Sequence, residues 1–363
     1  MKVLVYGISR TIGGISEYMM NISKNIDSSD IQFDYLIAGK DSYYAKRIKE
    51  RGGEIFYYTS KKKNCFKYLK DIFRTMKKLK HDHKILYFNS SGIYNIFPYL
   101  IAIMFRYKII IHAHNAKTNN INSFYRFLNF INHFIINNIK CIKFSCSDVA
   151  AEWVFGKNKE YIQINNGIDV EKYIFNLKER KYIRKKLNIS EEEILLGNVG
   201  RLVEAKNPFF LLKILKQINK KNNIYKLILV GDGELKEQLI KKSKQMKIED
   251  KVIFYGNSSN VNELLQAIDL FVMPSLYEGF PISLVEAQTA GLKCIVSDNI
   301  TKKVNITGLV KFVSLKDDEQ IWAENIIKEG NYNRTNMSLI MKEKNFDEKD
   351  ISKKIKEILE KVG

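Results

Sequence analysis

The sequence predicts an α/β protein built from two doubly wound domains, each a parallel sheet covered by helices. Three observations predict this fold. Short apolar runs alternate with segments of helical periodicity. The alternation pauses at a charged connector, residues 171–193, and then begins again. Turns that contain glycine or asparagine follow several of the apolar runs, as they do between the strands and helices of βαβ units.

The first half of the chain supplies one series of strands and helices. Strands are expected at residues 3–6, 33–38, 55–58, 85–88, 109–111, 141–145 and 162–164. Helices are expected from residue 15 to 26 and at 44–50, 66–80, 96–105, 124–139 and 148–155. The apolar runs are nearly continuous, which is typical of parallel strands buried on both faces.

Two of these helices have open interpretations. In the helix at 66–80 one apolar stripe is expected to face the core, and basic residues fill the other side; the stripe is Phe66, Leu69, Phe73, Met76 and Leu79. Such a helix either packs on the sheet, which we favour, or lies on an anionic bilayer. The helix at 124–139 carries aromatic residues on several sides, so it belongs either to the core or to an apolar surface on the acceptor side.

The second half repeats the pattern. Strands are expected at residues 194–199, 225–230, 252–255, 270–273 and 294–296, and helices at 209–217, 234–246, 261–267, 283–290 and 347–362. The expected domains are residues 1–169, residues 170–345, and a final helix, 346–363, that packs back on the first domain. Ligands are expected in the cleft where the two domains face each other.

Composition limits the class of protein. Apolar residues make up 45% of the chain, enough for a sizeable core, and the formal net charge is +20. The charge attracts polyanions, but the lysines are dispersed and not interleaved with stacking aromatics, so a nucleic-acid binder is disfavoured. We expect an intracellular chain without signal peptide or membrane span. The four cysteines have unrelated spacings, which indicates reduced thiols and no zinc site.

Residues 273–297 contain the most informative stretch. A strand ends at Met273, and a loop then carries Glu278, Gly279 and Phe280 to a short helix that holds Glu286 in its first turn. A helix amino terminus favours anions such as a diphosphate, and the two carboxylates can accept hydrogen bonds from sugar hydroxyls. The alternative for Glu286 is a capping box with Ser283.

Cations follow a second strand of the same domain. Arg201 and Lys206 come after the strand at 194–199, and Gly231 turns the chain after the strand at 225–230. Because the carboxyl ends of parallel strands share one edge, these residues should meet Glu278 there. Two cations and a helix end form a diphosphate clamp. The alternative is that Arg201 and Lys206 are ordinary surface charges.

The first domain offers a glycine pair and two histidines. Gly13 and Gly14 open the first helix, where they allow a ligand close to the backbone. With Gly7 they do not form G-x-G-x-x-G, which argues against a dinucleotide-dependent oxidoreductase or epimerase. His112 and His114 end a parallel strand at the ligand edge, and we expect one of them to contact a given ligand.

These motifs resemble those of retaining glycosyltransferases of the GT-B fold, in the large family 4 and of the capsule and exopolysaccharide type. The resemblance covers nearly the whole chain. The segments that carry it are Gly13-Gly14, HAHN at 112–115, SDVAAEWVFG at 147–156, NGID at 166–169, GRLVEAKN at 200–207, VGDGEL at 230–235 and SLYEGFPISLVEAQTAGLKCIVSD at 275–298. The spacing of Glu278 and Glu286 within the last segment is the most specific feature.

The resemblance implies roles for individual residues. Arg201 and Lys206 bind the diphosphate, Glu286 the ribose and Glu278 the transferred sugar, and the backbone around Gly279 and Phe280 assists. Gly13, Gly14 and Gly231 complete the donor site. The active-site histidine is His112, with His114 as second choice; the candidates on the acceptor side are His114, Asn115 and Glu17. No obligatory metal or cofactor is implied.

The resemblance also implies an activity. A hexosyl group passes with retention from a nucleotide-diphosphate sugar, expected to be a UDP-sugar, to a glycan acceptor that is expected to be lipid-linked. The protein is then cytoplasmic and peripheral at the inner face of the membrane, without nucleic acid as a partner. The alternatives are an inverting transferase of the same fold or a Rossmann-type enzyme that modifies nucleotide sugars. Ser16, Asn165 and Lys303 depart from the residues common in relatives at these positions.

Overall fold

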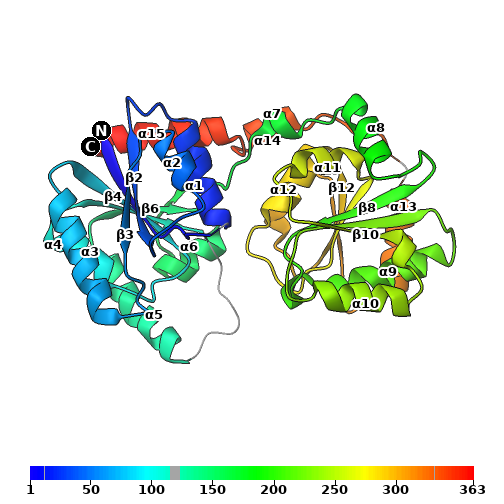
Figure 1. The fold of residues 1–363 in the computed structure, drawn as a ribbon, viewed down its shortest axis with the longest axis horizontal. Coiled ribbons are helices and arrows are strands. Elements are labelled where there is room, and N and C mark those ends of the chain that lie inside the picture. The colour runs from blue at the N-terminus through cyan, green and yellow to red at the C-terminus, as the bar shows by residue number, and fades with distance from the viewer. Residues whose placement is uncertain (12, 115–122, 331) are drawn as a thin grey trace. The chain divides into compact units, whose positions relative to one another are not determined.

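A computed structural model describes residues 1–11, 13–114, 123–330 and 332–363, and of residues 123–126 it describes the backbone alone. These residues form two units (Figure 1). Unit 1 comprises Met1–Gly167 and Asn345–Gly363, and unit 2 comprises Ile168–Lys344. The chain thus passes between units after Gly167 and after Lys344, whereas the sequence suggests divisions after residues 169 and 345.

Unit 1 contains a parallel sheet in the strand order β3-β2-β1-β4-β5-β6-β7. Its strands are β1 (Lys2–Tyr6), β2 (Gln32–Ala38), β3 (Ile55–Tyr58), β4 (His83–Ser90), β5 (Lys108–Ala113), β6 (Cys141–Ser145) and β7 (Ile162–Gln163). The predicted strands are confirmed, but β5 continues two residues beyond the predicted end at 111. His112 therefore lies inside the sheet, in register with Asn89 and Phe144.

Helices cover both faces of this sheet. They are α1 (Gly14–Lys24), α2 (Ala45–Lys49), α3 (Cys65–Leu79), α4 (Phe97–Met104), α5 (Ser123–Asn137), α6 (Asp148–Phe155) and α15 (Glu348–Val362). Side chains of α3, α4, α5 and α6 share one apolar core with the strands. Those of α1, α2 and α15 share the core on the opposite face, and α15 contacts α1 directly (Figure 1).

The buried face of α3 differs from the predicted stripe. Tyr68 and Ile72 are buried together with Met76 and Leu79, whereas Phe66 is 87% exposed. The prediction was wrong by a rotation of the helix, because Tyr68 and Ile72 complete an i, i+4, i+8 row that packs better than the row through Phe66 and Phe73. The basic residues of α3 are exposed as expected.

Helix α5 lies on unit 1 with polar residues inward. Asn129 and Asn132 are buried, while Phe130 and Phe134 are each 75% exposed. The Asn129 Oδ1 accepts a hydrogen bond from the backbone N–H of Ile93 at 3.1 Å, and the Asn132 Nδ2 donates to the Ile93 carbonyl at 2.6 Å. Of the two interpretations of this helix, the structure therefore favours the apolar surface.

Unit 2 contains a second parallel sheet, in the order β10-β9-β8-β11-β12-β13. Its strands are β8 (Ile194–Val199), β9 (Tyr225–Val230), β10 (Val252–Gly256), β11 (Leu270–Met273), β12 (Lys293–Ser297) and β13 (Val310–Val313). All were predicted except β13, an edge strand.

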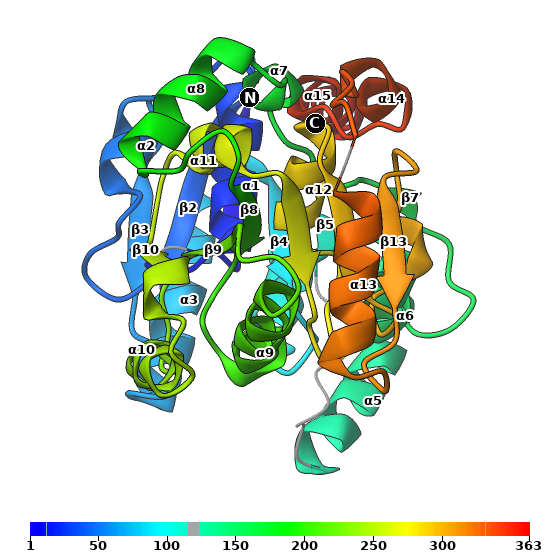
Figure 2. The same ribbon diagram turned by 90° about the vertical axis from the view of Figure 1, so that its right-hand side faces the viewer.

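The helices of unit 2 form two groups (Figures 1 and 2). They are α7 (Val170–Tyr173), α8 (Leu177–Lys186), α9 (Pro208–Asn219), α10 (Lys236–Gln245), α11 (Val261–Ala267), α12 (Ile282–Thr289), α13 (Glu319–Glu329) and α14 (Ser338–Glu343), with 3₁₀ turns η1 (Glu204–Lys206), η2 (Glu249–Lys251) and η3 (Lys302–Val304). Helices α9, α10 and α13 share one core with the strands. Helices α11 and α12 both contact α7, on the other face of the sheet.

Each sheet has a point where neighbouring strands send their connections to opposite faces. In unit 2 this point lies between β8, which leads to α9, and β11, which leads to α12. In unit 1 it lies between β1, which leads to α1, and β4, which leads to α4. Loops diverge at such a point and leave a crevice at the carboxyl ends of the strands, where ligands bind in open α/β sheets.

Within the part of the chain that the structure describes, we find no helix with both the length and the apolar character that crossing a membrane requires.

Candidate functional site

Backbone hydrogen bonds join the loops that follow β8, β9 and β11. The N–H of Leu202 donates to the carbonyl of Asp232 at 2.9 Å, and the N–H of Leu276 donates to the carbonyl of Ala205 at 2.9 Å. Three loops far apart in sequence are thus held together at the carboxyl edge of the unit 2 sheet. The predicted donor residues of unit 2 lie in or next to these loops, whereas Gly13 and Gly14 belong to unit 1.

Lys206 and Glu278 form a direct ion pair between two of these loops. The Lys206 Nζ contacts the Glu278 Oε1, and the two side chains are 20% and 11% exposed. Arg201, two residues after the end of β8, is exposed, and its side chain forms no ion pair with any described residue. The edge therefore combines an available guanidinium with a lysine that neutralises a carboxylate.

Glu286 lies on α12 and faces a residue that the sequence did not indicate. The phenol of Tyr173 on α7 donates a hydrogen bond of 2.6 Å to the Glu286 Oε1. Because α12 begins at Ile282 after Pro281, Glu286 is in the second turn, not the first as predicted. The capping-box alternative is wrong as well, since the N-cap is Pro281 and no side chain of a described residue caps the helix. No spacing rule in the sequence connects positions 173 and 286.

Burial raises the pKa of Glu286 above its usual value of 4.5, and the Tyr173 hydrogen bond and the charge of Lys172 act in the opposite direction. A carboxylate held in this way accepts hydrogen bonds well, because it has little water to compete with a hydroxyl donor. The arrangement suits a neutral diol better than an anion.

Gly231 has a conformation and a neighbour that require glycine. Its φ is +138°, and an added Cβ would lie 2.0 Å from the carbonyl oxygen of Gly200. This close approach holds the loop after β9 against the loop that carries Arg201. Gly279 and Phe280 are partly exposed and precede Pro281, so their backbone leads into the amino end of α12.

His112 and His114 point to the same side of β5 and lie against each other, with ring centroids 4.0 Å apart. The Nδ1 of His112 is 2.7 Å from the Tyr87 hydroxyl, and the Nε2 of His114 is 2.7 Å from the Asn89 Oδ1. Tyr18 of α1 packs edge-on against both rings. Their remaining nitrogens, Nε2 of His112 and Nδ1 of His114, have no hydrogen-bond partner among the described residues.

Both imidazoles are neutral at pH 7. Burial, and then the neighbouring His114, lowers the pKa of His112 well below its usual range. Burial lowers the pKa of His114 to about 4. His112 has no exposed surface and His114 retains 5%. The enclosed position of His112 does not fit a direct contact with a ligand, and His114 is the histidine of the pair that retains exposed surface.

The glycine pair in unit 1 has space around it. Among the described residues, an added Cβ on Gly14 would meet nothing within 4 Å, and one on Gly13 would meet only a carbonyl oxygen at 3.9 Å. Packing against the described part of unit 1 thus gives no reason for glycine at either position. Glu17 pairs with the guanidinium of Arg47 at 2.8 Å, a surface contact that accounts for it without a ligand. Asn115 lies outside the described residues.

Two positions that depart from the family pattern have structural roles. Ser16 is buried, and its Oγ accepts a hydrogen bond from the N–H of Ser9 at 2.9 Å, which shapes the loop before α1. The Nδ2 of Asn165 donates to the carbonyl of Asn345 at 3.0 Å and so joins two distant segments of unit 1. The structure therefore assigns both residues to the scaffold.

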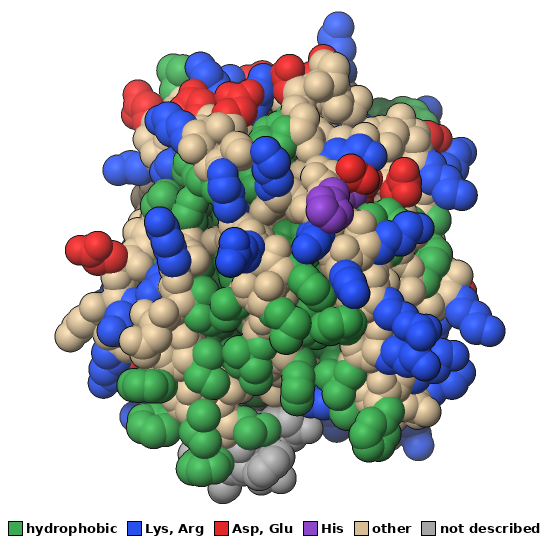
Figure 3. Space-filling model, turned by 90° about the vertical axis from the view of Figure 1, so that its left-hand side faces the viewer, with side chains coloured by type: hydrophobic (Ala, Val, Ile, Leu, Met, Phe, Trp, Pro, Cys, Tyr) green, Lys and Arg blue, Asp and Glu red, His purple; other side chains and the backbone are tan. Residues whose placement is uncertain are grey.

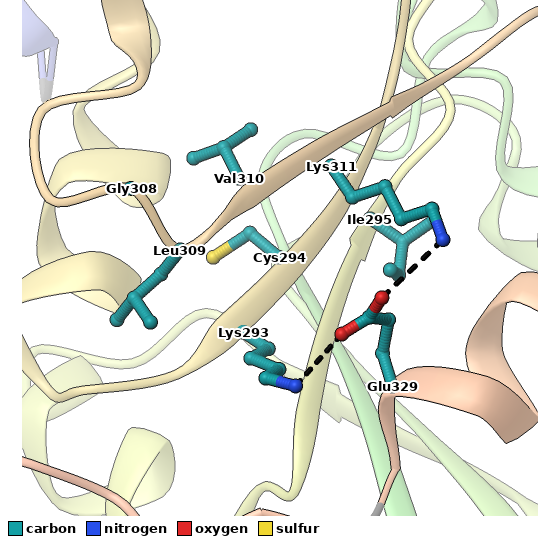
Figure 4. A pocket seen from close by; sticks show the side chains of 8 residues that line it. All are labelled: Lys293, Cys294, Ile295, Gly308, Leu309, Val310, Lys311 and Glu329. Atoms are coloured by element: carbon teal, nitrogen blue, oxygen red, sulfur yellow. Dashed lines mark hydrogen bonds and ion pairs between the residues drawn. The ribbon is translucent and has the colours of Figure 1, made fainter.

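A separate hollow of about 140 Å³ opens at the amino ends of β12 and β13 (Figure 4). Its two lysines, Lys293 and Lys311, both pair with Glu329, at 2.7 and 3.3 Å, so both cations already have a carboxylate partner. It lies at the opposite edge of the sheet from Arg201. Among the described residues, no cluster of His, Cys, Asp or Glu side chains is arranged to hold a metal ion.

The fold and the residues at the carboxyl edge of the unit 2 sheet define a class of protein. HepE of Anabaena, solved in complex with UDP, matches this chain with a TM-score of 0.81 at 18% sequence identity, over 99% of this chain and 100% of HepE. Two parallel-sheet Rossmann-like domains of this kind are the GT-B fold.

Sequence relatives show the family. A model for the family described as glycosyl transferases group 1 matches residues 179–328. EpsF of Bacillus subtilis (strain 168), a candidate glycosyltransferase, is 32% identical over 331 residues, which are 87% of this chain and 84% of EpsF. The UDP-Gal:alpha-D-GlcNAc-diphosphoundecaprenol alpha-1,3-galactosyltransferase of Escherichia coli is 27% identical over 241 residues, 64% of this chain and 62% of that enzyme. The chain belongs to the glycosyl transferases group 1 family and is a glycosyltransferase.

Proposed function

We propose that this glycosyltransferase moves a hexosyl group from a UDP-sugar to a lipid-linked glycan, with retention, in the biosynthesis of a capsular or exopolysaccharide. The observation that carries the donor assignment is the contact of Lys206 with Glu278 at the carboxyl edge of the unit 2 sheet, where Arg201 is exposed. This edge is where β8 and β11 send their connections to opposite faces of the sheet. UDP as the nucleotide is supported by its presence in the HepE structure. A diphosphoundecaprenol-linked acceptor is named for the Escherichia coli relative, which favours a lipid-linked acceptor here.

The donor assignment follows from the charges at this edge. Arg201 offers a planar fork of N–H donors, which fits phosphate oxygens, and Lys206 offers a point charge. When the diphosphate binds Lys206, the ion pair of Lys206 with Glu278 opens. The Glu278 carboxylate can then accept hydrogen bonds from sugar hydroxyls. Glu286, held by Tyr173, accepts from the ribose diol. Metal is not needed in this scheme, because two cations balance the leaving diphosphate.

The reaction follows from these positions. The acceptor oxygen attacks the anomeric carbon on the face from which the diphosphate leaves, and the acceptor proton passes to the departing phosphate oxygen. Arg201, Lys206 and the amino end of α12 stabilise the negative charge that grows on that oxygen. On the acceptor side we assign His114 of unit 1, in preference to the enclosed His112. The anomeric configuration of the product, determined by NMR, tests retention.

Glu286→Gln tests the donor site and has two opposed effects. Because the folded pKa of Glu286 is raised, its ionised form costs stability at neutral pH, and this cost disappears below the unfolded pKa of 4.5. The variant should therefore unfold at a higher temperature than the wild type at pH 7.5 and at the same temperature at pH 4. Its affinity for UDP-sugars should fall about tenfold or more, because a charge-assisted hydrogen bond is lost.

The measurement is a thermal-shift series with UDP-, GDP-, ADP- and dTDP-sugars, with and without magnesium. One nucleotide class should stabilise the wild type without magnesium, since a ligand of the native state raises its apparent stability. The exposed Glu237→Gln on α10 is the matched control. If no nucleotide sugar shifts the wild type, or if Glu286→Gln responds as fully as the control does, the donor assignment fails.

Gly14→Ala tests the glycine pair. Alanine at the first position of α1 should stabilise unit 1 by about 0.5–1 kcal/mol, because it removes the backbone entropy of glycine and meets no clash with a described residue. Transfer should nevertheless fall about tenfold, because the Cβ fills space that we assign to the ligand. Urea unfolding and initial rates measure the two effects; a stabilised variant with full activity would remove Gly14 from the donor site.

A further inference from the structure

The outer faces of α4 and α5 are apolar although they face solvent. The exposed residues are Phe97, Leu100, Ile103 and Met104 on α4, and Phe127, Phe130, Ile131 and Phe134 on α5. Single apolar residues are ordinary on a surface, but a contiguous group indicates a surface that something covers. Figure 3 shows such side chains gathered over the lower half of one face of unit 1.

The polar side of α5 fixes this orientation. Besides the bonds of Asn129 and Asn132 to Ile93 in the loop before α4, the Asn137 Nδ2 donates to the Phe155 carbonyl at 2.7 Å. These three amides of α5 thus bond to other segments of unit 1, and rotation of the helix to bury Phe127, Phe130 and Phe134 would break these bonds. Folding of unit 1 therefore leaves Phe127, Phe130 and Phe134 outside.

A band of positive charge borders the apolar face. Segment 61–80 carries eight lysines, Arg74 and a single acid, Asp71, whose carboxylate accepts from the N–H of Thr59. Helix α3 within this segment packs against α4, and its lysines and Arg74 are exposed. Neither α4 nor α5 contains an aspartate or glutamate. Lysines and arginines lie beside and above the apolar group in Figure 3.

We propose that this face, made of α3, α4 and α5, docks on an anionic lipid bilayer. Phe127, Phe130 and Phe134 of α5 and the exposed apolar residues of α4 enter the boundary between headgroups and acyl chains, while the basic residues of α3 contact lipid phosphates. The proposal rests on the proposed function for its purpose, since a lipid-linked acceptor lies in a membrane. A second copy of the chain is a poorer partner, because it would bring a like-charged band against this one.

The test is cosedimentation of the full chain with vesicles of phosphatidylcholine, with and without phosphatidylglycerol. At low salt the wild type should bind vesicles that contain phosphatidylglycerol. It should bind vesicles of phosphatidylcholine alone much less. Phe130→Glu/Phe134→Glu should weaken binding about tenfold or more. The matched control is Leu177→Glu/Leu339→Glu, which places the same charges at two exposed leucines of unit 2 and should leave binding unchanged. Lys70→Gln/Lys77→Gln should weaken binding about tenfold and reduce its salt dependence.

Three results would overturn the docking surface. The first is no vesicle binding by the wild type, and the second is an equal loss of vesicle binding in the two double glutamate variants. The third is a dimer of the wild type that Phe130→Glu/Phe134→Glu dissociates, because the face would then be a contact between two copies of the chain. The UDP-induced thermal shift of the same preparations separates this proposal from the donor site. A normal UDP shift without vesicle binding removes the docking surface alone, whereas vesicle binding without a UDP shift supports the surface and removes the donor assignment.

Discussion

Arg201→Ala should lower kcat/KM for sugar transfer about 10²–10³-fold, the usual consequence of removing one group that stabilises charge developing in a transition state. The guanidinium is exposed and forms no ion pair with any described residue, so its loss should change the unfolding free energy by less than about 0.5 kcal/mol. Arg201→Lys should keep part of the activity, because lysine retains the charge and loses the bidentate fork.

The control for Arg201→Ala is Lys213→Ala, which removes an exposed cation from α9 of the same unit. It lowers the net charge equally, so any general loss of attraction for the anionic donor appears in both variants. Initial rates at two salt concentrations separate this general effect from the local one. If Arg201→Ala retains the turnover of Lys213→Ala, the diphosphate is not bound where we place it.

The parallel sheets could be predicted because buried strands leave a strong apolar signal. The exception, β13, lies at the edge of its sheet, where Lys311 interrupts a four-residue strand. An edge strand is covered on fewer sides, so its sequence need not be continuously apolar. The strand forms because β12 pairs with it in the assembled sheet, and the sequence of β13 alone does not show that pairing.

Helix faces were harder to predict than helices. Periodicity shows that α3 and α5 are amphipathic, but in each of them two rows of side chains compete for the inner position. In α5, Asn129 and Asn132 face inward because the backbone of Ile93 offers them a donor and an acceptor. That partner comes from another segment of the chain, so no pattern within α5 could reveal it.

The candidate site divides in the same way. The gathering of Arg201, Lys206 and Glu278 follows from one rule, that parallel strands present their carboxyl ends at a common edge. The contact of Tyr173 with Glu286 does not, because α7 belongs to the connector and periodicity says nothing of where a connector packs. The burial of His112 was missed because β5 extends two residues further than its apolar run.

Lys206 and Glu278 should stabilise the fold as a pair, whereas each should have its own role in catalysis. Lys206→Met leaves a mostly buried carboxylate without its partner, which should destabilise unit 2 by about 2 kcal/mol. Turnover should fall about 10²-fold, because a cation that stabilises the leaving diphosphate is lost. Glu278→Gln should also lower turnover, through the loss of a charged acceptor for the sugar hydroxyls.

The double variant Lys206→Met/Glu278→Gln distinguishes the two properties. With neither charge present, most of the lost stability should return, whereas turnover should stay at or below that of either single variant. The comparison cycle is Lys293→Met/Glu329→Gln at the opposite edge of the sheet, where Glu329 also pairs with Lys311; it should change stability without changing turnover. If turnover in the first double variant recovers together with stability, the pair holds two loops together and does nothing further. If it does not recover, the ion pair is the resting state of two groups that separate when the donor binds.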